Sequence, residues 1–420
     1  MSFARRPVAA AALAAVTAVA VTACSSGGSD DASSAATTRE SVATSTGGAP
    51  SSNTPSHASS SSARPTTTPA PANSCVQRTY ERLSPAQRAG QLLMIGLDAN
   101  AASTADDSLI AEQHVGNVIY LGGWTGRSKI QSTSNHLQSE ASSSATGGVG
   151  MLIAADQEGG AVQQLRGPGF STLVSALQQG TMSSSARTAY ATTIGRQLKA
   201  AGVNLDLAPV SDTVPASMAA SNAPIGKYAR EYGHAPATVA AAVGDVVRGL
   251  DAGGVGATVK HFPGLGRITG NTDYTSVGTT DTVTTATDPY LRPFSAGMKA
   301  GAAAVMIASA HYAKLDPSTQ ATFSGKVITG LLRGTLGWHG VVVTDDMNAV
   351  AVSGIPVGER AVRFVAAGGD IVLTGRAANA SPMIGAILAR AGSDAAFAAK
   401  VTASVQRVLT LKRRLGLLHC

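Results

Sequence analysis

Residues 340–346 read Gly-Val-Val-Val-Thr-Asp-Asp, a short apolar run that ends in two carboxylates. A run that is continuously apolar, rather than alternating, is typical of a strand buried on both faces in a parallel sheet. Seven more runs of this kind lie along the chain. They are Gln91–Leu97, Val115–Gly122, Met151–Asp156, Val203–Pro209, Gly256–Pro263, Ala303–Ser309 and Asp370–Gly375.

Helix-length stretches separate these runs, among them Ala186–Ala201, Ala235–Ala252 and Val327–Leu336. Ser84-Pro85 has the pattern of a helix N-cap followed by a proline in the first turn. Eight strand–helix units predict an α/β fold of the (β/α)8 type, a TIM barrel. A doubly wound open sheet is the alternative, because it also alternates strand and helix.

The ends of the strands favour the barrel. Barrel enzymes place their chemistry at the carboxyl ends of several strands, whereas an open sheet gathers its site at one crevice. Alternation is expected to send Asp345 and Asp346 to opposite sides, one into the barrel mouth and the other into the surrounding shell. The reactive side chains at strand ends are Asp156, Asp206, Lys260, His261, His311 and Asp345.

Composition limits the class of protein. The 420 residues include 32 Lys and Arg against 25 Asp and Glu, with 4% aromatic residues and a formal charge of +7. These values exclude a transmembrane bundle, a coiled coil and a small disulfide scaffold. No basic run is interleaved with aromatic residues, so nucleic acid is not an expected partner. The His residues show no metal-ligand spacing, and we expect no metal, no cofactor and a monomer.

The first 24 residues predict export. Arg5-Arg6 is a basic start, Pro7–Ala23 is uncharged and rich in Ala and Val, and Val21-Thr22-Ala23-Cys24 resembles a lipobox. We expect residues 1–23 to be a signal peptide and Cys24 to be acylated, which would hold the protein at the outer face of the cell membrane. An ordinary signal peptide with an incidental cysteine is the alternative.

Residues 24–74 are expected to form a disordered tether, because after Cys24 they are Ser, Thr, Ala, Pro and Gly with scattered charges and almost no large apolar residue. The folded domain is then expected at residues 75–420, with Cys75 and Cys420 at its two ends. In an oxidising compartment we expect a disulfide between them, which requires neighbouring termini. Two free thiols are the alternative.

Three strand ends carry residues suited to chemistry. Lys260 and His261 follow an apolar run, where they are costly to bury unless they are paired or face a polar cavity. An inward carboxylate on a rigid strand, such as Asp345, suits a nucleophile. Asp156 is followed by Gly159-Gly160, which leaves room for a ligand to approach the backbone.

Five motifs together carry a resemblance to a known family. They are Asp156–Gly160, Leu207–Asp212, Arg230–Gly233, Lys260–Gly264 and Val327–Asp346, in this order and at the spacing of the family. The chain resembles the β-N-acetylhexosaminidases of glycoside hydrolase family 3, in the single-domain NagZ-like branch. It looks most similar to the exported lipoprotein members, of LpqI type.

This resemblance implies roles for particular residues. Asp345 would be the nucleophile, which forms a covalent glycosyl–enzyme that water then hydrolyses with retained configuration. Residues at four positions would bind sugar hydroxyls, by accepting or donating hydrogen bonds. A structural ion pair or cap is the alternative for Asp156 and Arg230. The four are Asp156, Arg230, Lys260 and His261.

The loop after Gly264 departs from the family. NagZ-like enzymes have an Asp-x-His dyad there, whose His is the general acid/base, and residues 264–275 contain no His. Counted without a gap from Lys260, Asp273 takes the place of that His; aligned on the Asp of the dyad, Thr275 does. We expect Asp273 to be the acid/base, with a raised pKa and a more acidic pH–rate profile than in the His-bearing relatives. The alternatives are that Asp273 only orders the loop, or that a distant His such as His311 replaces the lost one.

The function implied by the resemblance is an exo-acting, retaining β-N-acetylglucosaminidase. Its substrates would be GlcNAc-containing muropeptides or cell-wall fragments outside the cell membrane. Two alternatives stay open: a β-glycosidase of the same family that prefers another sugar, such as β-glucose, and a lipoprotein that binds muropeptides without cleaving them.

Overall fold

The computed structural model describes residues 72–99 and 104–419. The predicted signal peptide (1–23), Cys24 and nearly all of the predicted tether lie outside these residues. Helix α1 (Ala72–Arg82) begins just before the predicted start of the domain. Its Cys75 is buried and disulfide-bonded, whereas Cys420 lies outside the described residues, so the pairing of the two stays a prediction.

Eight parallel strands form the central sheet, in the order β13-β11-β9-β8-β4-β2-β1-β14. A parallel bridge between Val343 and Ile371 connects the two outermost strands, so the sheet closes into a barrel. Each predicted run matches one strand, and only β1 extends beyond its run, by one residue to Asp98. The barrel is therefore confirmed, and the open sheet is wrong. The strands are β1 (Leu93–Asp98), β2 (Asn117–Leu121), β4 (Leu152–Ala155), β8 (Leu205–Asp206), β9 (Gly256–Phe262), β11 (Ala304–Ile307), β13 (Val341–Thr344) and β14 (Val372–Thr374).

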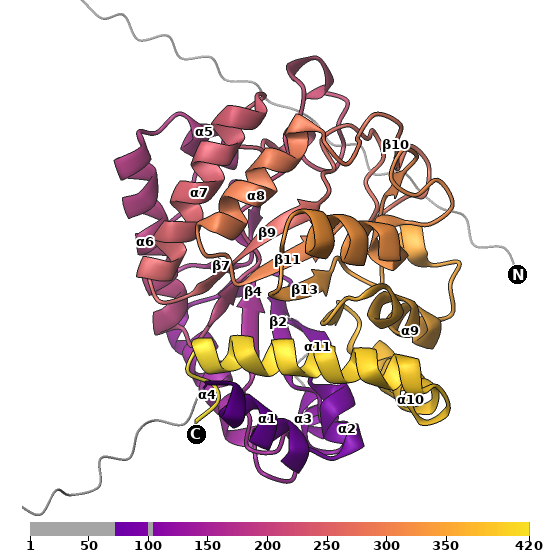
Figure 1. Cartoon of the computed structure of the whole chain (residues 1–420). Helices are drawn as coiled ribbons and strands as arrows, with labels where there is room; N and C mark the ends of the chain where they lie inside the picture. Colours follow the sequence, from indigo (N-terminus) through magenta and orange to yellow (C-terminus); the bar gives the residue numbers. More distant parts are fainter. Residues whose placement is uncertain (1–71, 100–103, 420) are drawn as a thin grey trace, which may run out of the picture. The chain divides into compact units, whose positions relative to one another are not determined.

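Helices surround the barrel, and Figure 1 shows the strands gathered inside them. The apolar strand residues are almost fully buried between the barrel interior and these helices, as two-sided burial requires. The larger helices are α2 (Pro85–Gly90), α3 (Thr104–Ala111), α4 (Arg127–Glu140), α5 (Ala176–Gly180), α6 (Ser184–Ala200), α7 (Pro236–Ala252), α8 (Arg292–Lys299), η5 (Lys326–Thr335), α9 (Val357–Ala367), α10 (Ala380–Ser393) and α11 (Ala395–Arg414).

The local helix signals agree with the structure in most places. Ser84 caps α2 by accepting a hydrogen bond from the Gln87 backbone N–H, and the Gln87 side chain accepts one from the Ser84 N–H in return. The predicted helices near 186–201 and 235–252 are α6 and α7. The third, η5, is a π-helix, and its end is marked by a bond from the Leu336 N–H to the Leu331 carbonyl.

Short strand pairs and turns of 3-10 helix lie in the connections that follow the barrel strands. The strand pairs are β3 (Trp124–Thr125) with β7 (Leu165–Arg166), β5 (Gln157–Gly159) with β6 (Val162–Gln163), and β10 (Thr280–Asp281) with β12 (His311–Tyr312). The 3-10 turns are η1 (Ala216–Met218), η2 (Gly226–Tyr228), η3 (Pro289–Leu291), η4 (Ala321–Phe323), η6 (Val350–Val352) and η7 (Ala377–Asn379).

The connection from β9 to α8 is one of the longest, and buried hydrogen bonds fix its course. Asn222 is fully buried and donates to the carbonyls of Leu265 and Ile268. Farther along, the N–H of Gly270 donates to the Gly278 carbonyl. A Cβ at Gly270 would collide with the Val277 carbonyl, so this closure requires glycine.

None of the helices in the described part of the chain combines the length and the apolar character that a bilayer crossing requires.

Candidate active site

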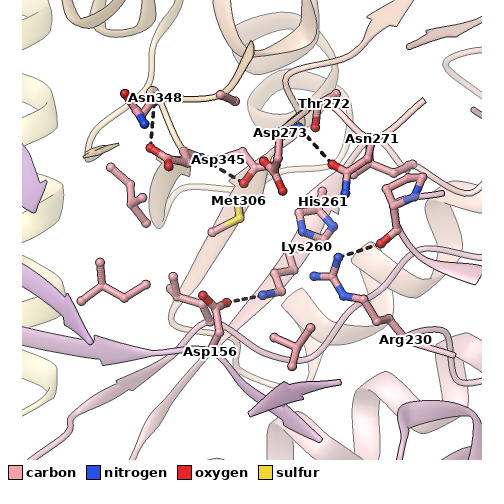
Figure 2. A pocket seen from close by; sticks show the side chains of 18 of the residues that line it. Asp156, Arg230, Lys260, His261, Asn271, Thr272, Asp273, Met306, Asp345 and Asn348 are labelled. Atoms are coloured by element: carbon pink, nitrogen blue, oxygen red, sulfur yellow. Dashed lines mark hydrogen bonds and ion pairs between the residues drawn. The ribbon is translucent and has the colours of Figure 1, made fainter. Parts of the chain in front are cut away.

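A cavity of about 480 Å³ opens at the carboxyl ends of the barrel strands (Figure 2). All six residues predicted for catalysis or sugar binding line it, although they come from distant parts of the sequence. The polar lining residues are Asp156, Gln164, Arg230, Lys260, His261, Asn271, Thr272, Asp273, Tyr274, Asp345, Asp346 and Asn348.

Lys260 lies at the floor of this cavity, near the end of β9. Its Nζ is 2.5 Å from Asp156 Oδ1 and 2.6 Å from Glu158 Oε1. Burial alone would lower the pKa of Lys260, but the charges of the two carboxylates outweigh it and raise the pKa above its usual value. Lys260 is therefore a charged, immobilised donor, as the predicted pairing requires.

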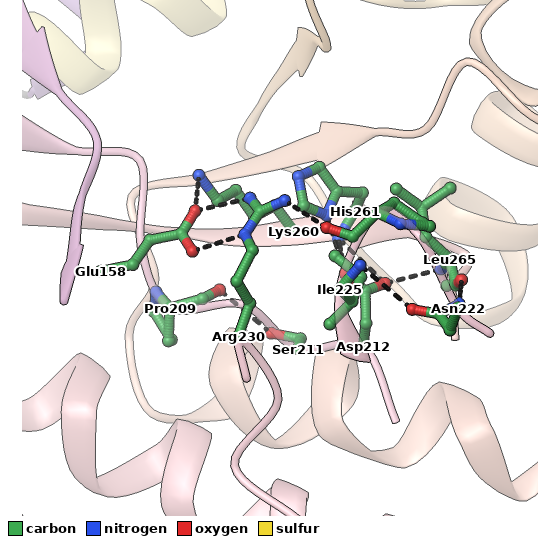
Figure 3. A network of polar contacts seen from close by, with 12 residues as sticks. Glu158, Pro209, Ser211, Asp212, Asn222, Ile225, Arg230, Lys260, His261 and Leu265 are labelled. Carbon is green, nitrogen blue, oxygen red and sulfur yellow. Dashed lines mark hydrogen bonds and ion pairs between the residues drawn. The ribbon is translucent and has the colours of Figure 1, made fainter. Parts of the chain in front are cut away.

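Arg230 is held by the same carboxylate. Its Nε and Nη2 donate to the two oxygens of Glu158 at 2.8 and 2.7 Å, and its Nη1 donates to the Pro224 carbonyl at 2.8 Å (Figure 3). Burial would raise the pKa of Glu158, yet Arg230 and Lys260 lower it to about 2. Glu158 thus joins the two cations into one rigid network.

His261 is oriented by Asp212, which lies after β8. Its Nδ1 is 2.7 Å from Asp212 Oδ2, and Asp212 Oδ1 accepts a second hydrogen bond from the Leu265 N–H (Figure 3). Because a carboxylate accepts, we assign the proton to Nδ1, which leaves Nε2 for the cavity. Asp212 therefore fixes both the ring and the start of the β9–α8 connection.

Asp345 and Asp346 both line the cavity, so the prediction that they face opposite sides is wrong. Strand β13 ends at Thr344, and alternation does not extend beyond it. Their hydrogen bonds differ instead. Asp346 accepts from the N–H groups of Asn348 and Gly375, each at 2.8 Å. Asp345 accepts from the Asp346 N–H at 2.9 Å.

Asp273 lies beside Asp345 at the cavity mouth (Figure 2). The residue is exposed there, but the protein around its carboxyl group raises the pKa of Asp273 to about 6, through desolvation first and the Asp345 charge second. Two backbone bonds hold this part of the loop: Val350 N–H to the Asp273 carbonyl at 3.2 Å, and Ala351 N–H to the Thr272 carbonyl at 3.0 Å.

The other candidates for the acid/base position lie elsewhere. Thr275 does not line the cavity, so the count without a gap from Lys260 is the one that places a side chain in it. His311, in β12, does not line it either, and burial lowers the pKa of its imidazole. Of the residues considered from the sequence for this position, Asp273 is the one in the site.

From the sequence, Glu158 and Asp212 receive no role, and Asp206 is named only as a reactive side chain at a strand end. The first two lie inside motifs that carry the family resemblance, and this was the one feature of the sequence that could have indicated a role for them. Asp206, in β8, is fully buried; its Oδ1 accepts from the Gln157 N–H at 3.0 Å, and its Oδ2 has no partner within the described residues. Burial raises the pKa of Asp206 to about 8.

Within the described residues, no three His, Cys, Asp or Glu side chains are grouped so that they could hold a metal ion. What the site offers is two carboxyl groups in different environments above a network of charged donors and acceptors. This arrangement suits acid/base and nucleophilic chemistry on a polyhydroxylated substrate.

Comparison with known proteins agrees with this chemistry. The sequence model described as the glycosyl hydrolase family 3 N terminal domain matches residues 86–411. A β-hexosaminidase of Xanthomonas campestris pv. campestris (strain B100) is 34% identical over 294 residues, which cover 67% of this chain and 83% of the relative.

Solved structures of similar proteins share the fold. The crystal structure of a β-N-acetylhexosaminidase from Beutenbergia cavernae DSM 12333 is 45% identical, with a TM-score of 0.77, over 79% of this chain and 99% of that one. LpqI of M. tuberculosis is 26% identical, with a TM-score of 0.66, over 79% of this chain and 94% of that one.

Proposed function

This chain belongs to glycosyl hydrolase family 3 and is a glycoside hydrolase, and from this premise we propose that it is an exo-acting, retaining β-N-acetylglucosaminidase. One observation carries the proposal: two carboxyl groups, Asp345 and Asp273, lie together at the cavity mouth, and the pKa of Asp273 is raised to about 6. A retaining glycosidase needs one carboxylate to attack and one carboxylic acid to protonate the leaving group. The names of the similar hexosaminidases support the choice of sugar.

In the first step, a carboxylate oxygen of Asp345 bonds to the anomeric carbon of the terminal sugar while the bond to the bridging oxygen breaks. Asp273 gives its proton to that oxygen, and the leaving group departs as an alcohol. In the second step, Asp273 takes a proton from water, and the water oxygen bonds to the anomeric carbon. Asp345 is then released as a carboxylate, and the configuration is retained.

The charged network below these two residues would bind the sugar. Lys260 would donate to hydroxyls, whereas Asp156 and the unprotonated Nε2 of His261 would accept from them. Arg230 already donates to Glu158 and Pro224, so it would act mainly by holding Glu158 against Lys260. The members of this network hold one another in place, so its donors are already oriented before the substrate binds. This lowers the entropy cost of orientation.

We also propose where the enzyme acts and on which substrate. The pattern of residues 1–24 is that of an exported lipoprotein, and residues 25–74 would tether the catalytic domain outside the cell membrane. Peptidoglycan fragments with a terminal GlcNAc are the GlcNAc-containing carbohydrates expected at that location.

The test measures hydrolysis of 4-nitrophenyl β-GlcNAc and of the matching β-glucoside by the wild type, Asp345→Ala and a control, Glu359→Gln, on the surface of α9. We expect GlcNAc release by the wild type and the control, and a loss of about 10⁴-fold or more in Asp345→Ala, because the nucleophile is removed. A preference for the glucoside would contradict the sugar assignment. Tight muropeptide binding without turnover would make the chain a binding protein.

A trapping experiment tests the covalent step. A fluorinated glycosyl inhibitor should add its sugar mass to one peptide, the one that contains Asp345. Labelling of another side chain, or no labelling of an active enzyme, would reject Asp345 as the nucleophile.

The acid role of Asp273 predicts a pH dependence. Proton transfer to the leaving group requires the neutral form of Asp273. Therefore kcat/KM on a saccharide should fall as pH rises above about 6. In Asp273→Asn, this decrease of kcat/KM at high pH should disappear. The variant should lose far less activity on a dinitrophenyl glycoside than on a saccharide, because the dinitrophenolate leaving group departs without a proton. Equal losses on both substrates would show that Asp273 only orders the loop.

A further inference from the structure

The large apolar side chains that are exposed in the described structure lie on one face of it. All of the large exposed apolar residues lie in connections that follow barrel strands, on the face where the cavity opens. The connections after β8, β9 and β13 contribute them. They are Tyr228, Tyr274, Val277, Val283 and Val350, and the two most exposed are Val277 at 79% and Tyr274 at 77%.

Tyr274 differs from the others because it also lines the cavity. A single exposed apolar residue needs no explanation, but an aromatic ring kept in water beside a sugar-sized cavity is a ready contact surface. Its side chain is uncharged, as are those of the mouth residues Asn271, Thr272 and Asn348, which offer hydrogen bonds to hydroxyls. This part of the mouth therefore suits a neutral ring with one apolar face.

The backbone holds Tyr274 in place. The N–H groups of Tyr274 and Thr275 both donate to the Asn271 carbonyl at 3.0 Å, which forms a tight turn over residues 271–275. The Asp273 N–H donates to Asn271 Oδ1, and the Asp273 carbonyl accepts from Val350. The turn thus presents Asp273 and Tyr274, neighbours in sequence, to the same cavity from a fixed support.

We propose that Tyr274 forms a leaving-group subsite, in which its ring stacks on the apolar face of the second sugar of the substrate. This proposal rests on the proposed function, in which Asp273 protonates the oxygen between the first and second sugars. The group on the far side of that oxygen must lie next to Asp273, and Tyr274 is the aromatic residue beside Asp273 that lines the cavity. The substrate class that follows is a β-linked amino-sugar disaccharide or longer chain.

The binding test uses the inactive variant Asp345→Asn, with GlcNAc and with N,N'-diacetylchitobiose as probes, by titration calorimetry. Adding Tyr274→Ala should weaken chitobiose binding about tenfold, the effect of losing some 50 Å² of apolar contact, and should change GlcNAc binding less than twofold. Tyr274→Phe should restore chitobiose binding. Tyr228→Ala, an exposed tyrosine on the neighbouring connection that does not line the cavity, is the matched control and should change neither.

The kinetic test compares chitobiose with methyl β-GlcNAc in the active enzyme. Tyr274→Ala should lower kcat/KM for chitobiose about tenfold and leave the methyl glycoside within twofold, since methyl has no ring to stack. Equal losses on both substrates would mean that the tyrosine only supports the loop, and no loss on chitobiose would remove the subsite. If the wild type hydrolyses neither substrate, the proposed function fails, and the calorimetry still decides whether Tyr274 binds the second sugar. Absence of chitobiose binding to Asp345→Asn would overturn the subsite.

Discussion

Two buried lysines lie at opposite ends of the barrel strands, and their surroundings shift their pKa values in opposite directions. Lys260, at the carboxyl end, has Asp156 and Glu158 as partners, and its pKa is raised. Lys412, on α11, is also fully buried. Its Nζ donates to Gln91 Oε1 at 2.7 Å and to the Gly116 carbonyl at 2.8 Å, just before β1 and β2, and burial lowers its pKa to about 7.

The difference shows what separates the two ends of this barrel. At the carboxyl end, a buried cation is kept charged by carboxylates, and the ionic groups surround a cavity. At the amino end, the same residue type has neutral partners, so burial favours its uncharged form. The first arrangement can bind a polar ligand, whereas the second joins the last helix to the floor of the barrel.

The largest predicted effect comes from removing the charge of Lys260. Lys260→Met removes a counter-charge from the buried Glu158 and from the partly exposed Asp156, so we expect kcat/KM to fall by about 100-fold or more and the free energy of unfolding to fall by about 3 kcal/mol. Lys412→Met is the matched variant and should keep kcat/KM within twofold. Enzyme kinetics and chemical denaturation measure the two quantities. A similar loss of activity in both variants would remove the distinction between the two ends.

Asp206 extends the comparison to a buried carboxyl below the site. Its pKa is raised from 3.8 to about 8, so the folded protein keeps a proton that the unfolded chain loses. The stability contributed by this group is full below pH 3.8 and is lost as the pH rises toward 8. Relative to Asp206→Asn, the wild type should lose on the order of 1 kcal/mol per pH unit across this window. Denaturation at several pH values tests this, and a constant difference would mean that Asp206 is ionised in the folded protein.

Lys412 should give the opposite slope. Its pKa is lowered from 10.5 to about 7, so between these values the unfolded chain binds the proton and the folded protein does not. The stability from the neutral form is full above pH 10.5 and is lost as the pH falls toward 7. The wild type should therefore gain stability relative to Lys412→Met as the pH rises, by up to about 1 kcal/mol per pH unit. A difference that does not change with pH would show a charged Lys412.

The barrel was predictable from the sequence because its signal is local. A strand buried on both faces is a continuous apolar run wherever it occurs, and all eight runs match a barrel strand. The boundaries were less predictable: the run at 203–209 contains a strand of two residues, Leu205–Asp206. The predicted orientation of Asp345 and Asp346 was wrong because the end of the strand was also misjudged. Alternation holds only within a strand, and β13 ends before these two residues.

The partners within the site could not be predicted, because they are set by the closure of the barrel. Glu158 and Arg230 are 72 residues apart, and Asp212 and His261 are 49 residues apart. Each of these residues lies in a motif that is recognisable in the sequence. No local pattern, however, indicates which carboxylate pairs with which cationic side chain. The position of Asp273 was open in the sequence for a similar reason, and the placement of its loop against the segment after β13 brings it to the site.

The smallest predicted effect concerns an ion pair on the outer surface. Glu359 and Arg363 are one turn apart on α9, 2.9 Å from each other and both exposed, in contrast to the pair between Lys260 and Glu158, which is almost fully buried. In water the attraction is screened, and ordering two long side chains costs entropy, so Glu359→Gln should change the free energy of unfolding by less than about 0.5 kcal/mol. Denaturation at low and high salt measures it, and wild type and variant should converge as salt rises. A change comparable to that of Lys260→Met would mean that ionic contacts stabilise this protein irrespective of burial, and the contrast between the two lysines would then need another cause.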